Sequence, residues 1–376
     1  MKSLRLGLTV GALATALAVV LPFIGLHVPW ILPGTVDVVN STGTLFTLAL
    51  CFVFAGVAMG YDVMFGYTGL LSLGVVMHFG AGVYVFVIAL TFWHWSLLGA
   101  AMLSLSFALV LAVICGAIAL RVSGIAFTMV TLALAQAFYY LVEDNPHGLT
   151  GGESGLPLTS SRLPSIFSGA VSNTRNLYWI ALGFLIVVFF VVWLITESST
   201  GHVFVAVRDN ERRVEVLGLR PFTFKLVAYV LSSLVAAGGG MVYVLLVGTA
   251  VPSAVASTSV TLSIVIMVVL GGAGSRWGAM AGGIIYVYLQ QYLVKVAAEP
   301  SFATLPTFLR VPLTQPQFLL GAIFILFVIF VPGGIAGAFT RLRFRGAPSR
   351  AATTAPTLGP DVTVVEIVSY SREGDS

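Results

Sequence analysis

Charged residues are scarce in this sequence. Only 9% of its 376 residues are Asp, Glu, Lys or Arg, whereas 58% are hydrophobic; in a soluble domain about a quarter of the residues carry a charge. Eighteen bases and fourteen acids cannot cover the surface of a soluble protein of this length. The composition therefore excludes a soluble globular fold and predicts that most of the chain lies in a lipid bilayer.

Several chemical motifs are missing as well. The sequence has no GxxxxGK[ST] loop and only three lysines, Lys2, Lys225 and Lys295, so we expect no ATP hydrolysis by this chain alone. It has no HExxH, CxxC or GxSxG, and Cys51 and Cys115 both lie in apolar runs, where a packing role is expected. We therefore predict a protein that is not an enzyme, with no metal, no cofactor and no nucleic-acid partner. No acid lies well inside an expected span, which argues against a carrier driven by protons or sodium.

The positions of the charges predict how often the chain crosses the membrane. A charge at the centre of a bilayer costs about 2.5 to 3.5 kcal/mol, so spans lie between charged residues. Two uncharged intervals, of 58 residues after Asp62 and 50 after Lys225, are each long enough for two crossings. Six others fit one crossing each: 5–37, 37–62, 121–143, 175–197, 276–295 and 310–341. The expected fold is all-α, a polytopic membrane bundle of about ten helices.

The distribution of bases predicts the orientation. With the N-terminus in the cytoplasm, fourteen Lys and Arg residues lie inside and four outside, as the positive-inside rule requires. Both termini are then cytoplasmic, the loop 144–175 is external and the charged loop 197–224 is internal. We expect residues 1–340 to form the membrane domain and residues 341–376 to form a cytoplasmic tail without a fixed fold.

Two glycine-rich segments interrupt apolar stretches, one around 66–74 and one around 271–278. Glycine at this density weakens a helix, so a bent or interrupted helix is expected, with its freed backbone groups covered by neighbouring helices or facing water. Paired interruptions of this kind are typical of a substrate path, and close packing through small residues is the alternative. The residues assigned to the path are Gly66, Gly69, Ser72, Gly74, Gly271, Gly272 and Gly274.

A short helix is expected in the internal loop. Asp209 or Asn210 is a suitable N-cap, Glu211 favours a first turn, and Gly218 is a natural stop. Such a helix needs a surface to dock on, either a cytoplasmic subunit or the lipid headgroups. The residues assigned to coupling with an ATPase are Arg208, Asp209, Asn210, Glu211, Val214, Leu217 and Gly218.

These residues occur in an order that resembles the branched-chain amino acid ABC transporter permease family of the LivM type. The similarity runs from about residue 45 to residue 335 and departs at Arg212 and Arg213, near positions where such loops often carry alanine. The matching residues include Gly66, Tyr67, Gly69, Leu71, Ser72, Leu73, Gly74; Thr150, Gly151, Gly152, Gly155; Ser199, Thr200, Gly201, Arg208, Asp209, Asn210, Glu211, Leu217, Gly218; and Gly271, Gly272, Gly274, Ser275, Gly278.

The resemblance implies the permease subunit of a type II ABC importer in the bacterial inner membrane. Its expected partners are a second homologous permease, two cytoplasmic ATP-binding subunits and an extracytoplasmic solute-binding protein. The short helix would then be the coupling helix. Branched-chain amino acids are the expected solutes, and a permease for urea or short amides looks similar across the same motifs. An ion-coupled carrier or a channel without an ATPase is the alternative from another class.

Overall fold

The computed structural model describes residues 22, 41–158, 170–297, 315–331 and 333–338. The expected first span and the expected tail 341–376 lie outside these residues. The long helices are α2 (Thr42–Asp62), α3 (Val75–Thr91), α4 (Leu97–Ala119), α5 (Ile125–Glu143), α6 (Ala170–Glu197), α9 (Pro221–Val247), α11 (Thr258–Gly271), α12 (Arg276–Ala297) and α14 (Pro316–Phe330). The shorter elements are α7 (Ser199–Asp209), α8 (Glu211–Val216), α10 (Pro252–Val255), β1 (Leu156–Pro157), β2 (Thr249–Ala250), a π-helical turn Val63–Tyr67 and the 3₁₀ turns Pro146–Gly148 and Gly152–Ser154.

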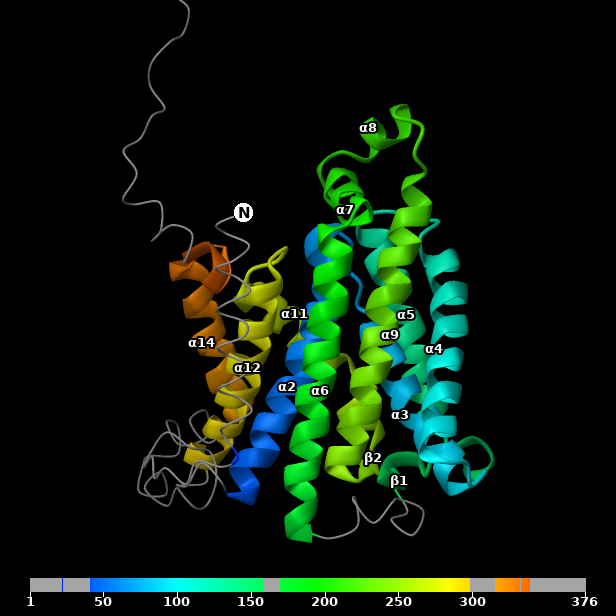
Figure 1. Ribbon diagram of the computed structural model, residues 1–376, viewed down its shortest axis with the longest axis vertical. Helices are drawn as coiled ribbons and strands as arrows, with labels where there is room; N and C mark the ends of the chain where they lie inside the picture. The colour runs from blue at the N-terminus through cyan, green and yellow to red at the C-terminus, as the bar shows by residue number, and fades with distance from the viewer. Residues whose placement is uncertain (1–21, 23–40, 159–169, 298–314, 332, 339–376) are drawn as a thin grey trace, which may run out of the picture. The chain divides into compact units, whose positions relative to one another are not determined.

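Helix α2 lies at the centre of the bundle (Figure 1). Ser41 caps it by accepting a hydrogen bond from the Thr44 N–H at 3.3 Å, and most of its side chains are buried against α6, α9, α11 and α12. Small residues permit this packing. A Cβ placed on Gly283 of α12 would lie 2.6 Å from the Cα of Ala55, so the two backbones almost touch.

Helices α4, α5 and α14 lie at the periphery and expose large apolar side chains, among them Leu98, Ile114 and Phe330. Such surfaces suit lipid rather than water. Within the described residues, seven helical segments are long and apolar enough to cross a membrane: 42–67, 97–119, 125–143, 174–197, 221–247, 252–271 and 316–338. The all-α membrane bundle is therefore confirmed, while the count of ten crossings stays a prediction.

The bundle has two different ends (Figure 1). At one end, the α8 end, α7 and α8 project beyond the long helices; at the other, the β1 end, β1 pairs antiparallel with β2, with Leu156 opposite Ala250. The charged loop 197–224 and the loop after α5 therefore lie at opposite ends, as expected.

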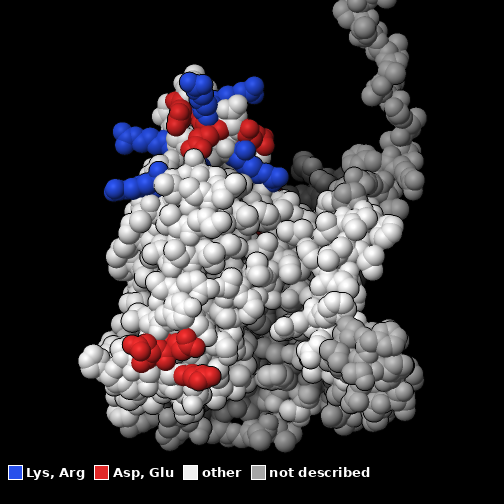
Figure 2. Space-filling view, turned by 180° about the vertical axis from the view of Figure 1, so that it is seen from behind, with Lys and Arg blue, Asp and Glu red and all other residues white. Residues whose placement is uncertain are grey.

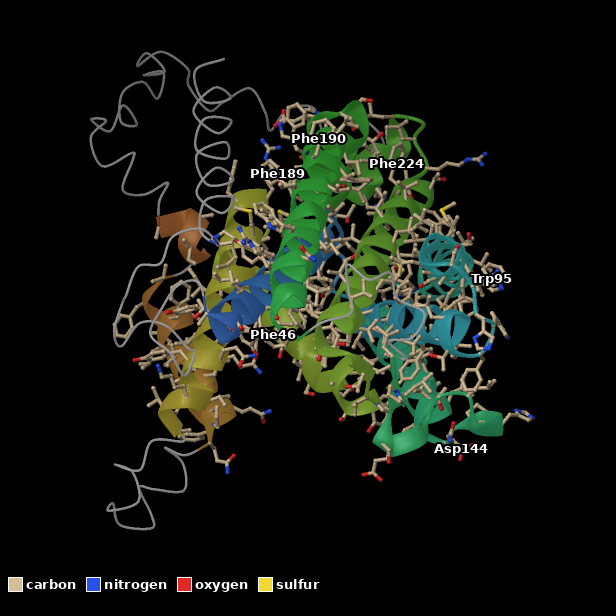
Figure 3. The ribbon with its side chains drawn as sticks, turned by 60° about the horizontal axis from the view of Figure 1, so that its bottom comes forward. Phe46, Trp95, Asp144, Phe189, Phe190 and Phe224 are labelled. Atoms are coloured by element: carbon tan, nitrogen blue, oxygen red, sulfur yellow. The ribbon has the colours of Figure 1, made fainter. Side chains whose placement is uncertain are left out.

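Charged side chains are concentrated at the two ends of the bundle. Figure 2 shows charged side chains gathered at the α8 end, a band without them across the middle of this face, and an acidic group at the other end. Trp95, between α3 and α4, is exposed, as is Trp93 beside it. Trp95 and Asp144 lie on the side of α4 and α5, away from α14 (Figure 3). Exposed tryptophans next to an apolar band are typical of a membrane–water interface.

Candidate functional site at the junction of the glycine-rich segments

The first glycine-rich segment begins where α2 ends, at the buried residue Asp62, which is 1% exposed. Its Oδ1 atom accepts a hydrogen bond of 2.8 Å from the backbone N–H of Gly274, in the second segment. A Cβ on Gly66 would lie 2.0 Å from Oδ1 of Asp62 and 2.2 Å from the nitrogen of Gly274. Only a residue without a side chain fits here, so the two segments meet at Gly66, Asp62 and Gly274.

The chain from Thr68 to Gly74 is not helical, and hydroxyl groups bind its backbone. The Tyr61 hydroxyl donates to the carbonyl of Ser72 at 2.9 Å, and the N–H of Leu73 donates to Oγ1 of Thr131 at 3.1 Å. Thr128 donates to the carbonyl of Leu71 at 2.8 Å. Neighbouring helices thus cover the freed backbone groups, which confirms the expected interruption and lets α3 begin inside the bundle.

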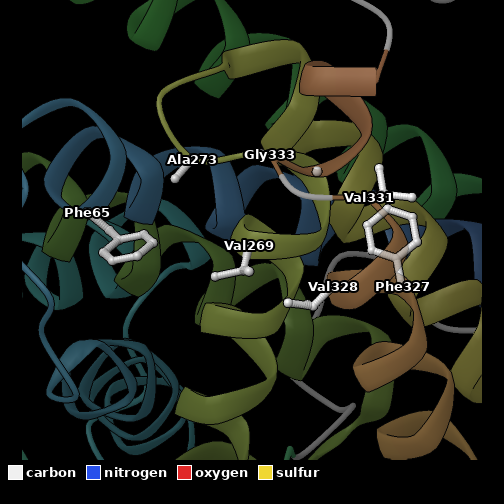
Figure 4. Close-up of a pocket in the computed structure, with 9 residues that line it drawn as sticks. Phe65, Val269, Ala273, Phe327, Val328, Val331 and Gly333 are labelled. Atoms are coloured by element: carbon white, nitrogen blue, oxygen red, sulfur yellow. The ribbon is translucent and has the colours of Figure 1, made fainter. Parts of the chain in front are cut away.

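The second segment connects α11 to α12. A Cβ on Gly271 would lie 2.0 Å from the carbonyl oxygen of Gly278, so the end of α11 packs directly on the start of α12. Beside Gly272 is a cavity of about 330 Å³, lined by apolar residues such as Phe65, Val269 and Phe327 (Figure 4). Arg276, the first residue of α12, donates to Oε1 of Glu197 at 2.8 Å and thereby fixes α12 to the end of α6.

Arg208 reaches this junction from α7. Its Nη1 atom donates a hydrogen bond to the carbonyl oxygen of Gly66. The same atom would lie 3.1 Å from a Cβ on Gly274, and Cγ of Arg208 would lie 3.1 Å from a Cβ on Gly69. One side chain of the projecting loop therefore contacts both glycine-rich segments.

Helix α8 has the expected caps. The side chain of Asn210 accepts a hydrogen bond from the Arg213 N–H at 3.0 Å, and Gly218 ends the helix with φ +82°. Asp209 is the last residue of α7, so Asn210 and not Asp209 is the cap. Val214 is buried within the chain, whereas Leu217 is exposed. Glu211 pairs with Lys225 of α9, Oε2 to Nζ, at 2.6 Å.

The residues assigned from the sequence thus fall into separate groups. Gly66, Gly69, Gly274 and Arg208 come together. Gly74 lies against Thr131 of α5, and its N–H donates to the hydroxyl of Ser72. Gly271 and Gly272 face α12 and the chain after α14. Sequence reasoning placed Asp62 only at the edge of a span and missed its role here. It also missed Val216, which is 84% exposed beside Leu217. Within the described ranges no group of three His, Cys, Asp or Glu side chains could hold a metal ion.

Comparison with known proteins agrees with this architecture. The family described as "Branched-chain amino acid transport system / permease component" matches residues 43–331, which include every described element from α2 to α14. The high-affinity branched-chain amino acid transport system permease protein LivM of Escherichia coli (strain K12) is 25% identical over 281 residues, 67% of this chain and 64% of its own length. LivM of Salmonella typhimurium is 25% identical over 284 residues, with the same two coverages.

The chain is also similar to a permease named for a different solute. The autoinducer 2 import system permease protein LsrC of Escherichia coli O9:H4 is 26% identical over 248 residues, 64% of each chain. The chain therefore spans slightly less than two thirds of the length of these curated relatives. No solved structure matches it. Because the family matches most of the sequence, including both glycine-rich segments and the loop with α7 and α8, the chain belongs to the branched-chain amino acid transport system permease family.

Proposed function

We propose that this protein is the membrane-spanning permease subunit of an ABC importer and that it forms the path for a small polar solute, a branched-chain amino acid in the first instance. The observation that carries the proposal is the family match over residues 43–331, a segment that contains both the interrupted helices and the projecting α7–α8 loop. The LivM relatives support the branched-chain amino acid as solute.

The shape of the α8 end supports coupling to an ATP-binding subunit. Val216 and Leu217 are 84% and 77% exposed at the tip of the projection, and the charged residues around them keep this tip out of the hydrocarbon core. A helix of six residues is not stable on its own in water. A groove on a cytoplasmic subunit would cover these apolar side chains, so we place the α8 end in the cytoplasm.

The remaining partners follow from the same proposal. A second homologous permease would complete the path, two ATP-binding subunits would dock at the two α8 ends, and an extracytoplasmic binding protein would deliver solute to the β1 end. The location is the bacterial inner membrane. Hydrolysis of ATP belongs to the partner subunits, because no phosphate-binding loop occurs in this sequence.

Reconstitution tests the proposal. The complex is purified from its native membrane in mild detergent and placed in liposomes with ATP or a non-hydrolysable analogue inside, and uptake of radiolabelled leucine, isoleucine and valine is measured. We expect uptake that needs hydrolysable ATP and the binding protein. Uptake driven by a proton or sodium gradient, or equal uptake with the analogue, would establish the carrier or channel instead.

A second solute class has its own support, because relatives named for autoinducer 2 import match the chain almost as well as LivM does. In the same liposomes, autoinducer 2 and urea are therefore tested as competitors of leucine uptake, and the uptake of each is also measured directly with labelled compound. Competition by isoleucine and valine alone supports the first proposal, and ATP-dependent uptake of autoinducer 2 or urea without leucine uptake overturns it.

A further inference from the structure

We propose that Arg208 is a positioning residue that fastens α7 to both glycine-rich segments, so that a movement imposed on α7 and α8 is delivered to residues 62–74 and 271–276 inside the bundle. The source of that movement, an ATP-binding partner, rests on the proposed function. The fastening itself rests on contacts within this chain.

The position of the Arg208 side chain supports this fastening. Arg208 was expected to face an ATPase, yet its side chain extends toward the bundle, where Nη1 donates to the carbonyl of Gly66. Its stem crosses Gly69 so closely that a Cβ there would lie 3.1 Å from Cγ of Arg208. Although part of the Arg208 side chain is exposed, its stem and Nη1 lie against the first glycine-rich segment and do not extend into water.

The buried carboxyl group of Asp62, at the junction that Arg208 reaches, also supports the fastening. Asp62 is buried, its Oδ1 accepts from Gly274, and Oδ2 has no hydrogen-bond partner among the described residues. An ionised carboxylate in such a place needs a positive group close by. Arg208 brings a positive charge to the carbonyl of Gly66 and beside Gly274, the two residues that lie against this carboxylate. The planar guanidinium has donors in several directions, an arrangement that the ammonium group of lysine reproduces less well.

The ion pairs at the α8 end connect different parts of the structure. Helix α8 is tied to α9 by Glu211 and Lys225, and α12 is tied to the end of α6 by Arg276 and Glu197. These ion pairs join helix ends to one another. From α7, Arg208 reaches the π-helical turn at Gly66 and the non-helical residues Gly69 and Gly274, where the backbone can change its dihedral angles without breaking an α-helix.

The test compares Arg208→Ala and Arg208→Lys with Arg121→Ala, which removes an exposed arginine that follows α4 at the same end of the bundle. Three quantities are measured on the full complex: the ATP-binding subunits that co-purify, the maximal rate of leucine uptake, and hydrogen exchange of the backbone at 271–276. For Arg208→Ala we expect normal co-purification, at least a tenfold fall in maximal uptake and faster exchange at Gly274. Arg208→Lys should fall between it and the wild type, and Arg121→Ala should match the wild type.

A cross-link then separates fastening from a merely structural role. The Cβ atoms of residues 69 and 208 would lie 3.6 Å apart, which suits a disulfide. In the Gly69→Cys, Arg208→Cys double variant we expect low uptake when reduced and recovery when oxidised, because the covalent bond replaces the arginine. The two single variants, treated with the same oxidant, should not recover. The native cysteines Cys51 and Cys115 are buried and do not compete.

The outcomes separate this inference from the proposed function. If the wild-type complex retains no ATP-binding subunit, the proposed function fails, while exchange at 271–276 still reports whether Arg208 holds the segment. If wild-type uptake is normal and Arg208→Ala matches Arg121→Ala in uptake and in exchange, the fastening is overturned. An oxidised double variant that stays inactive while the Gly69→Cys single variant transports also overturns it, since α7 must then move relative to Gly69.

Discussion

The backbone N–H of Gly274 donates a 2.8 Å hydrogen bond to Oδ1 of Asp62, although 212 positions separate the two residues in the sequence. This bond joins the end of α2 to the connection between α11 and α12, and Gly66 fits between them. An acid that is 1% exposed at the end of the central helix therefore organises backbone from both halves of the chain.

Replacing Asp62 should separate the two glycine-rich segments. In Asp62→Ala the Gly274 N–H loses its acceptor, and an unpaired buried donor costs about 1–3 kcal/mol. We expect a lower melting temperature of the purified protein and strongly reduced uptake. Asp62→Asn keeps an oxygen for Gly274 and should lose less stability than Asp62→Ala. Equal melting temperatures for Asp62→Ala and the wild type would contradict the structural role of the carboxylate.

Adding one methyl group at Gly66 should disrupt the same junction. A Cβ there would lie 2.0 Å from Asp62 Oδ1, so Gly66→Ala must displace the carboxylate or Gly274, and overpacking of this kind costs about 1–3 kcal/mol. Gly183 of α6 is the matched control, because a Cβ there has no atom within 4 Å. We expect Gly66→Ala to abolish uptake at normal expression and Gly183→Ala to leave it unchanged. Similar uptake in both variants would show that the junction tolerates expansion.

The sequence predicted features that depend on local chemistry. Scarce charges indicated a membrane bundle because the cost of burying charge applies to each residue separately. The cap at Asn210 and the stop at Gly218 followed from the preferences of single residues, and the structure has both.

Features that depend on distant contacts were not predictable in the same way. Asp62 looked like the polar end of a span, since nothing in its neighbourhood indicates that Gly274 will lie beside it. Val214 was assigned to coupling with an ATPase, yet it is buried within the chain, because the path of the chain around α8 decides which side faces outward. The direction of the Arg208 side chain also depends on distant contacts, with Gly66 and Gly274, and was not predictable from the sequence.

The orientation of the bundle can be measured with introduced cysteines. Ser154 lies in an exposed turn beside β1, and Val216 lies at the tip of the projection at the opposite end. With the α8 end in the cytoplasm, Ser154→Cys should react with a membrane-impermeant maleimide in intact cells, and Val216→Cys only after the cells are opened. Reaction of Val216→Cys in intact cells would reverse the orientation.

The ion pair between Glu211 and Lys225 should matter for how α8 is presented. Glu211→Lys places two positive charges where the side chains now approach to 2.6 Å, and it also removes a negative charge from the helix N-terminus. We expect fewer ATP-binding subunits to co-purify with this variant. The exchanged pair Glu211→Lys, Lys225→Glu restores the attraction and should recover most of the association. If the exchanged pair is as weak as the single variant, Glu211 contacts the partner directly.

The stop at Gly218 gives a final prediction about coupling. Gly218 has φ +82°, and its N–H and that of Leu219 bond to the carbonyls of Glu215 and Val214 at 2.9 and 3.3 Å, which closes the end of α8. A non-glycine residue in this conformation costs about 1–2 kcal/mol, more when it is β-branched.

That cost is small for the whole bundle but large for a helix of six residues, so Gly218→Val should leave insertion and melting temperature unchanged while Val216 and Leu217 lose their fixed position. We expect co-purification of ATP-binding subunits and solute-stimulated ATP hydrolysis both to fall, and Gly218→Asn, which tolerates a positive φ, to retain more of each. Gly218 is exposed, and no atom lies within 4 Å of an added Cβ, so collision cannot explain the effect. Wild-type values for Gly218→Val in both assays would show that α8 is an anchor at the membrane surface and not the coupling helix.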